Sequence, residues 1–176
     1  MTFDINKSIE VLSRTPIAIE SLLSGVSEEW IKGNEGEGTW SPYDVVGHLI
    51  HGEKTDWIPR AKIILSDAVD KTFIPFDRFA QMQEDQERPI EALLTEFKTL
   101  RAQNLEELRS LQLDLHPSKL SEKGIHPDFG EVNLKALLST WVVHDMGHVA
   151  QISRVIAKQY ASEVGAWRAY LTILKK

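Results

Sequence analysis

The sequence predicts an all-α fold, a four-helix bundle whose helices are joined by long crossover connections. Apolar residues recur with helical spacing along most of the chain, and no segment shows the sustained apolar–polar alternation of a half-buried strand. No Asn-Gly or Asp-Gly pair stands between β-branched runs, so no tight β-hairpin is expected. Four long helical stretches with two lengthy connections favour a bundle with crossovers over a simple series of helical hairpins.

The first helix is expected over residues 4–24, with Ile5, Ile9 and Leu12 on one face. Pro16 interrupts it, because proline lacks the backbone N–H that a helix interior needs. We therefore expect a new segment to begin there with Thr15 as its N-cap. The stretch WIKGNEGEG that follows is rich in glycine and acid, a composition typical of a loop.

The second helix has a clear start signal in the stretch TWSPYDVVGHLIHGE. Ser41 is the predicted N-cap, Pro42 occupies the first helical position, and Asp44 lies three residues after the cap, as in a capping box. The helix is expected to run toward Trp57. Pro59 should then kink or end it before helical spacing resumes in RAKIILSDA.

The third helix follows a predicted crossover loop at residues 70–77. It should start after Pro89 and extend from about Ile90 to Leu113. Its apolar residues repeat at helical spacing and are expected to face inward: Leu93, Leu94, Phe97, Leu100, Leu105 and Leu108.

The last third of the chain should hold a loop, the fourth helix and a short final helix. The segment LHPSKLSEKGIHPDFGE carries turn signals and is predicted to be a loop. Asn133 is the expected N-cap of a helix over about residues 134–160. A short helix is expected from Ala166 to Leu174.

Composition limits the class of protein. A length of 176 residues suits a single domain over 1–176, and the absence of cysteine excludes disulfides, cysteine-ligated zinc and a thiol nucleophile. A net charge of −6 without a Lys/Arg cluster argues against nucleic-acid binding. The N-terminus lacks the apolar core of a signal peptide, and no apolar run approaches the roughly 18 residues of a membrane span. We therefore expect a soluble, cytoplasmic protein.

Two histidines occupy the predicted buried face of the fourth helix. Residues with the spacing of one helical face are Leu137, Trp141, His144, His148, Ile152 and Val155. Histidines at i and i+4 point the same way and can hold one metal ion between them. Two imidazoles buried without partners would cost about 1–3 kcal/mol each, and a shared cation removes that cost. The alternative is a pair of core histidines that donate to nearby carbonyls, or a pair on a solvated edge.

A third histidine strengthens the prediction of a metal site. His48 lies on the second helix, one turn after its capping box, and would complete a three-nitrogen ligand set. His51 follows three residues later and could support the site or lie at the surface. His126, just before the fourth helix, could approach the same end of the bundle. Whether these two reach the site is left open.

The motifs TWSPYDVVGHLIHGE, HPDFGEVNLKALLSTWVVHDMGHVAQISRVIAKQY and VGAWRAYL, in this order, resemble the DinB-like superfamily of metal-binding helical proteins. The resemblance extends from RTPIAIESLLSGVSEEW to the C-terminus. It implies a bundle of up-up-down-down type, often a homodimer. It also implies a divalent ion, usually zinc or nickel, held by His48, His144 and His148, none of which is substituted here. Three protein ligands with one exchangeable position are typical of catalytic rather than structural zinc.

The resemblance implies two reactions on a small-molecule substrate. Some members transfer low-molecular-weight thiols such as bacillithiol or mycothiol to electrophiles, and others are described as metal-dependent hydrolases. We therefore expect a metal-dependent transferase or hydrolase, with such a thiol as a candidate co-substrate. The alternative is a non-catalytic metal-binding or stress-response protein. A fourth coordination position that opens to a cleft favours catalysis, whereas one filled by a side chain favours a structural role.

No catalytic residue is predicted beyond the ligands. Glu53 and Asp145 are the nearest carboxylates in sequence, but each is turned about 100–140° from its neighbouring ligand on a helical wheel. That placement suits partners of the ligand imidazoles, or surface charges, better than bases aimed at substrate. Further residues could line a pocket or simply lie in the core or in solvent: Trp40, Trp57, Trp141, Trp167, Arg154 and Arg168.

Overall fold

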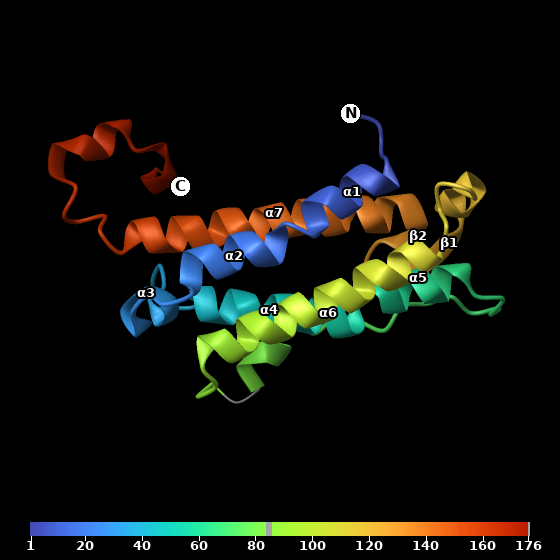
Figure 1. The fold of residues 1–176 in the computed structure, drawn as a ribbon, viewed down its shortest axis with the longest axis horizontal. Coiled ribbons are helices and arrows are strands. Elements are labelled where there is room, and N and C mark those ends of the chain that lie inside the picture. The colour runs from blue at the N-terminus through green and yellow to red at the C-terminus, as the bar shows by residue number, and fades with distance from the viewer. Residues whose placement is uncertain (84–85, 176) are drawn as a thin grey trace.

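Four helical rods form the bundle in the computed structural model, which describes residues 1–83 and 86–175 (Figure 1). The first two rods are each broken into consecutive helices, and the short helix α3 lies in the connection between them. The α-helices are α1 (Ile5–Leu12), α2 (Thr15–Leu23), α3 (Glu28–Lys32), α4 (Pro42–Thr55), α5 (Trp57–Leu65), α6 (Ile90–Ser110) and α7 (Leu134–Lys158). The predicted four-helix bundle is confirmed.

Ion pairs between neighbouring rods and the view in Figure 1 together give the direction of each rod. Lys54 of α4 pairs with Glu96, and Lys62 of α5 pairs with Glu107 eleven positions later on α6, so these rods are parallel. The rod of α1 and α2 and the rod of α7 run the opposite way (Figure 1). Two rods therefore run in each direction, in the order one up, two down and one up along the chain. The up-up-down-down order that the family resemblance implied was wrong, because the parallel pair is the second and third rods. The long connection 66–89 joins the two parallel rods.

Start signals in the sequence correspond closely to the observed helix ends. The capping box at α4 is complete: the Ser41 hydroxyl accepts from the Asp44 N–H, and the Asp44 carboxylate accepts from the Ser41 N–H. The break between α4 and α5 falls at Asp56, so Pro59 sits in the first turn of α5, where its missing N–H is tolerated. Thr15 proves to be the first residue of α2 rather than its N-cap, which is Arg14.

A small β-hairpin occupies the segment that the sequence predicted to be a loop. Strand β1 (Lys123–His126) pairs antiparallel with β2 (Gly130–Asn133). Gly130 closes the turn at φ +72°, a conformation that glycine adopts without strain. The crossover segment lies along this hairpin, because Phe73 N–H donates to the Ile125 carbonyl at 2.9 Å. The expectation of no hairpin was therefore wrong.

The C-terminal segment also differs from its prediction. Two 3₁₀ segments, Gly165–Tyr170 and Thr172–Leu174, replace the expected short α-helix. Further 3₁₀ turns lie at Ala80–Gln83 and Pro117–Ser121. Asn133 caps α7 as predicted, since its side chain accepts from the Ala136 N–H at 2.8 Å.

Two apolar clusters form the core, one toward each end of the bundle. The cluster at the hairpin end contains Trp57, Phe73 and Trp141, and the other contains Leu49 and Phe97. The predicted inward face of α6 is buried except at Leu100, which is partly buried. Within residues 1–83 and 86–175, each helix is too short or too polar to cross a membrane.

Candidate metal centre

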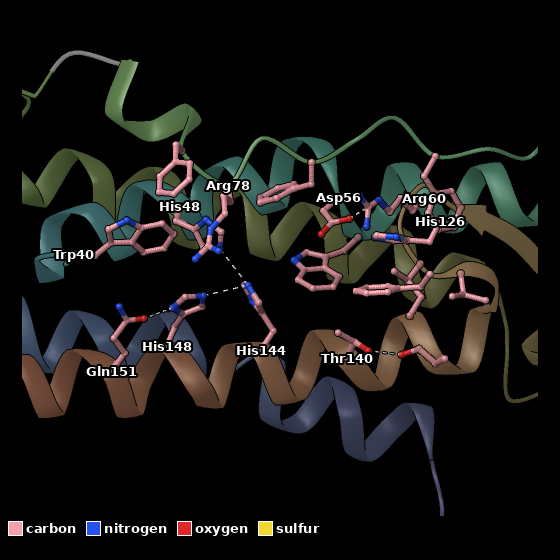
Figure 2. A pocket seen from close by; sticks show the side chains of 18 of the residues that line it. Trp40, His48, Asp56, Arg60, Arg78, His126, Thr140, His144, His148 and Gln151 are labelled. Atoms are coloured by element: carbon pink, nitrogen blue, oxygen red, sulfur yellow. Dashed lines mark hydrogen bonds and ion pairs between the residues drawn. The ribbon is translucent and has the colours of Figure 1, made fainter. Parts of the chain in front are cut away.

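Three histidines from two helices converge on one point. His48 comes from α4, and His144 and His148 come from successive turns of α7 (Figure 2). The Nε2 atom of His144 lies 3.2 Å from that of His48 and 3.1 Å from that of His148. The antiparallel packing of α4 against α7 brings together residues that are 96 positions apart in sequence.

The three imidazoles are held in the neutral form that binds metals. Burial, followed by the neighbouring His148, lowers the pKa of His48 to about 3. Burial and then the other two rings lower the pKa of His144 to about 3, and burial also lowers the pKa of His148. Each ring therefore keeps a nitrogen lone pair at neutral pH.

Gln151 sets the orientation of His148. Its side-chain oxygen lies 2.9 Å from Nδ1 of His148, so Nδ1 carries the proton and the Nε2 lone pair faces the other rings. Gln151 lies three residues after His148, and this one-turn spacing on a helix could have identified it from the sequence. Nδ1 of His144 has no comparable partner among the described residues.

The geometry fits a shared divalent ion. Zinc–imidazole bonds of about 2.0–2.1 Å at tetrahedral angles place ligand nitrogens roughly 3.3 Å apart, close to the observed spacings. All three ligand atoms lie within 4.8 Å of one another. Among residues 1–83 and 86–175, no carboxylate joins the three histidines as a fourth ligand. The arrangement therefore leaves one coordination position for a ligand from outside the protein.

The histidines line a cavity of about 690 Å³. Its walls come from α4, α5 and α7, from the crossover segment, from the hairpin and from the chain just before α4 (Figure 2). Trp40 stacks near His148, with ring centroids 6.3 Å apart and planes 14° apart. The aromatic lining consists of Trp40, Trp57, Phe73, Phe76, Phe79 and Phe129. A mostly apolar cavity with a few convergent polar groups is the usual form of a small-molecule site.

Arginines outnumber acids in the cavity wall, although the chain as a whole carries a net charge of −6. Arg154 binds both oxygens of Glu35 at 2.8 Å, and this hydrogen bonding lowers the pKa of Glu35 to about 2. Arg60 pairs with Asp56. The guanidinium carbon of Arg78 lies 5.7 Å from the ring centroid of Trp40. The wall thus has three cations and two carboxylates.

Glu53 and Asp145 do not support the imidazoles as the sequence suggested. Both are fully buried and both pair with Arg101, at 2.7 Å and 2.6 Å respectively. Neither forms a hydrogen bond with a ligand histidine, and neither lies at the surface. Both earlier interpretations were therefore wrong. The carboxylates belong to a separate ionic network around Arg101 of α6.

The remaining candidates divide between the cavity, the core and the surface. His51 lies against Phe76 outside the cavity lining, and His126 lines the cavity at the end away from the metal centre. Trp40, Trp57 and Arg154 line the cavity as the sequence allowed. Trp141 is buried and stacks on Trp57, Trp167 is 74 % exposed, and Arg168 donates to the Ala161 carbonyl.

Residues missed by the sequence reasoning are Asp56, Arg60, Phe73, Phe76 and Gln151. Asp56 lies eight residues after His48, a helical spacing that could have placed it on the same face. Phe73 and Phe76 lie in a crossover segment, where no periodicity reports which side chains face the bundle.

Comparison with known proteins gives one family match and a similar solved structure. A family model described as the DinB superfamily matches residues 12–152. YfiT from Bacillus subtilis, described as a probable metal-dependent hydrolase with an unusual four-helix bundle topology, has a TM-score of 0.75 to this structure. The two sequences are 18 % identical, and the alignment covers 90 % of each chain. No curated protein is similar enough to count as a match.

Proposed function

Because this chain belongs to the DinB superfamily, we propose that it is a metal-dependent hydrolase of small molecules, with His48, His144 and His148 as the protein ligands of a divalent ion. One observation carries the proposal. The three Nε2 atoms meet at the wall of a large cavity, and no described carboxylate completes the ligand set. The description of YfiT as a probable metal-dependent hydrolase supports the choice of reaction.

The chemistry of the donor set favours zinc or nickel. Three neutral imidazoles are suited to these borderline ions, and carboxylate-preferring magnesium or calcium would find no oxygen ligand from the described residues. A bound ion of this kind polarises a carbonyl group and lowers the pKa of water or of a thiol that reaches it. Gln151 fixes the His148 ring, while Trp40 and Phe76 lie against His48 and limit solvent on that side.

Thiol transfer is the second candidate, and the pairing of the cavity's carboxylates with arginines favours it. Glu35 and Asp56 are the carboxylates of the wall, and each is paired with an arginine. Hydrolysis commonly uses a carboxylate as proton acceptor, whereas a thiol activated by the ion needs no such base. A low-molecular-weight thiol would then be the co-substrate. Assembly as a homodimer and a cytoplasmic location stay predictions.

A paired activity screen tests the proposal. The protein is loaded with Zn²⁺ or Ni²⁺ and assayed on a panel of esters and amides. It is assayed separately on electrophiles with bacillithiol, mycothiol or glutathione. We expect hydrolysis that disappears on metal removal and in His144→Ala but persists in Arg109→Ala, whose exposed side chain lies on α6 outside the cavity. Turnover only with a thiol would replace hydrolysis by transfer. Full metal loading without turnover would leave a non-catalytic metal-binding protein.

A further inference from the structure

A second polar cluster lies in the cavity, at the end away from the three histidines. It consists of Asp56 at the junction of α4 and α5, Arg60 on α5 and His126 on β1 (Figure 2). Arg60 Nε lies 2.6 Å from Asp56 Oδ1, and the two residues are only 7 % and 8 % exposed. The hairpin and the crossover segment enclose this end of the cavity.

The cluster presents hydrogen-bond donors to the cavity. Nδ1 of His126 accepts the Asp128 backbone N–H at 3.1 Å, so in the neutral ring the proton sits on Nε2, which is then a donor. The His126 ring is stacked on Phe129 with centroids 4.4 Å apart. Asp56 holds Arg60 by its Nε edge, and the outer edge of the guanidinium makes one long contact, 3.4 Å to the Ile74 carbonyl. A ligand acceptor would therefore find donors here from Arg60 and His126.

Stability alone does not account for this ion pair. A buried salt bridge is a poor stabilising device, because desolvation of the two charges offsets their attraction, and apolar side chains would serve the fold as well. Asp56 also sits at the break between two helices, with φ −107° and ψ −76°. The pair lies in the wall of the same cavity that the three histidines line, where a guanidinium edge is available to a ligand.

The separation of the two polar ends limits the shape of the ligand. Asp56 follows His48 by eight residues, and a rise of 1.5 Å per residue puts them about 12 Å apart along the rod. Trp57, Phe73 and Phe76 line the cavity: Trp57 and Phe76 contact the histidine end, and Phe73 contacts Arg60 at the other end. An elongated molecule with an apolar middle section matches that space.

We propose that Arg60 and His126 form a binding site for the carboxylate of an elongated substrate, whose other end reaches His48, His144 and His148. Asp56 orients the guanidinium of Arg60, and the aromatic wall binds the apolar body between the two polar ends. The half of this proposal that concerns the histidine end rests on the proposed function. The Arg60 and His126 half does not, and it can be measured by itself.

Binding to the metal-free chain of residues 1–176 tests the Arg60 and His126 half. Hexanoate and its neutral counterpart hexanamide are titrated calorimetrically after chelation, with circular dichroism to confirm that the chain remains folded. We expect hexanoate to bind at least about tenfold more tightly, the difference expected for a charge-assisted hydrogen bond. Arg60→Gln and His126→Gln should each reduce that preference, whereas Arg109→Gln, on an exposed stretch of α6, should retain it.

The variant Arg60→Gln leaves the buried Asp56 carboxylate without its partner and could misfold. Two further variants therefore separate loss of binding from loss of folding. The double variant Asp56→Asn with Arg60→Gln removes both charges together, and His126→Gln leaves the ion pair intact. If either folded variant with Arg60 replaced keeps the full preference for hexanoate, the proposal is overturned. Equal binding of hexanoate and hexanamide to the unchanged chain would overturn it as well.

A second arm tests whether one ligand spans both ends. Hydroxamic acids with a terminal carboxylate and increasing chain length are compared with their terminal amides on the metal-loaded protein. We expect the carboxylate to improve affinity only at a length that spans the cavity, and to lose that advantage in His126→Gln. A carboxylate advantage that is independent of length contradicts the spanning geometry. If the unchanged chain binds no divalent ion but still prefers hexanoate to hexanamide, the proposed function alone is refuted.

Discussion

Two consecutive residues of α7, His144 and Asp145, point into two polar sites of opposite character. Asp145 faces a dry ionic network in which Arg101 pairs with Asp145 and Glu53, and all three residues are at most 2 % exposed. His144 faces a cavity, where its Nε2 meets two other ring nitrogens and its Nδ1 has no partner among the described residues. A rotation of about 100° around one helix separates a site that is complete from a site that needs a ligand.

The ionic network of Arg101, Glu53 and Asp145, the closed network, joins four helices. Arg101 of α6 donates to Glu53 of α4, to Asp145 of α7 and to the Leu12 carbonyl at the end of α1. Asn104 supplies a further donor to Glu53 at 2.9 Å. Because its polar contacts are satisfied within the protein, this network holds the helices that carry the histidines and leaves no group for a substrate.

The largest effect is expected when the closed network loses its cation. Arg101→Met leaves two buried carboxylates without a partner, and breaking a buried pair in this way lowers the free energy of unfolding by about 3–5 kcal/mol. Urea denaturation measures the change, with Arg109→Met on the exposed face of the same helix as the matched control. A loss no greater than that of the control would show that the network does not stabilise the bundle.

A smaller effect, on metal affinity, is expected at the three-histidine site, the open site, when the Gln151 side chain is removed. Gln151→Ala frees the His148 ring, and loss of such a partner typically lowers metal affinity about 10–100-fold. Competition with a chromophoric chelator measures the affinity. Gln103→Ala, on the exposed face of α6, is the control. The free energy of unfolding of the metal-free chain should stay close to that of the unchanged chain, in contrast to Arg101→Met. Unchanged affinity would contradict the orienting role.

The smallest effect concerns the rim of the open site, where Arg154 binds Glu35. The pKa of Glu35 is lowered from 4.5 to about 2, so the folded state gains stability above pH 4.5 and loses it as the pH falls toward 2. Allowing for solvent screening, we expect the unchanged chain to lose about 1–2 kcal/mol more than Glu35→Gln over that interval. Urea denaturation at a series of pH values measures the difference. Parallel pH curves for the two proteins would contradict this.

Local signals made much of the fold predictable. The Ser41 and Asp44 capping box, the Asn133 cap and the apolar spacing of α6 depend on neighbours within a few turns, so the sequence alone indicated them. The hairpin was missed because its turn closes with Gly130 at the end of a longer loop instead of a two-residue Asn-Gly or Asp-Gly pair. A single domain over the whole chain stays a prediction.

The site was predictable only in part, because contacts between rods depend on how each helix is rotated. Helical spacing placed His144 and His148 together, the position of His48 on the second helix made it the third candidate, and the family resemblance implied the same three ligands. Nothing local indicated that Glu53 would turn toward Arg101, or that Arg60 would meet a histidine from a hairpin. These contacts join segments far apart in sequence, and helical periodicity carries no information about them.

The central claim is that one ion is shared by three imidazoles, and zinc stoichiometry tests it most directly. Purified chain is loaded with Zn²⁺, dialysed and analysed by mass spectrometry of the metal, alongside His144→Ala and the control Gln103→Ala. We predict one equivalent of zinc in the unchanged chain and in the control, and its loss in His144→Ala. A full equivalent retained by folded His144→Ala would contradict the claim.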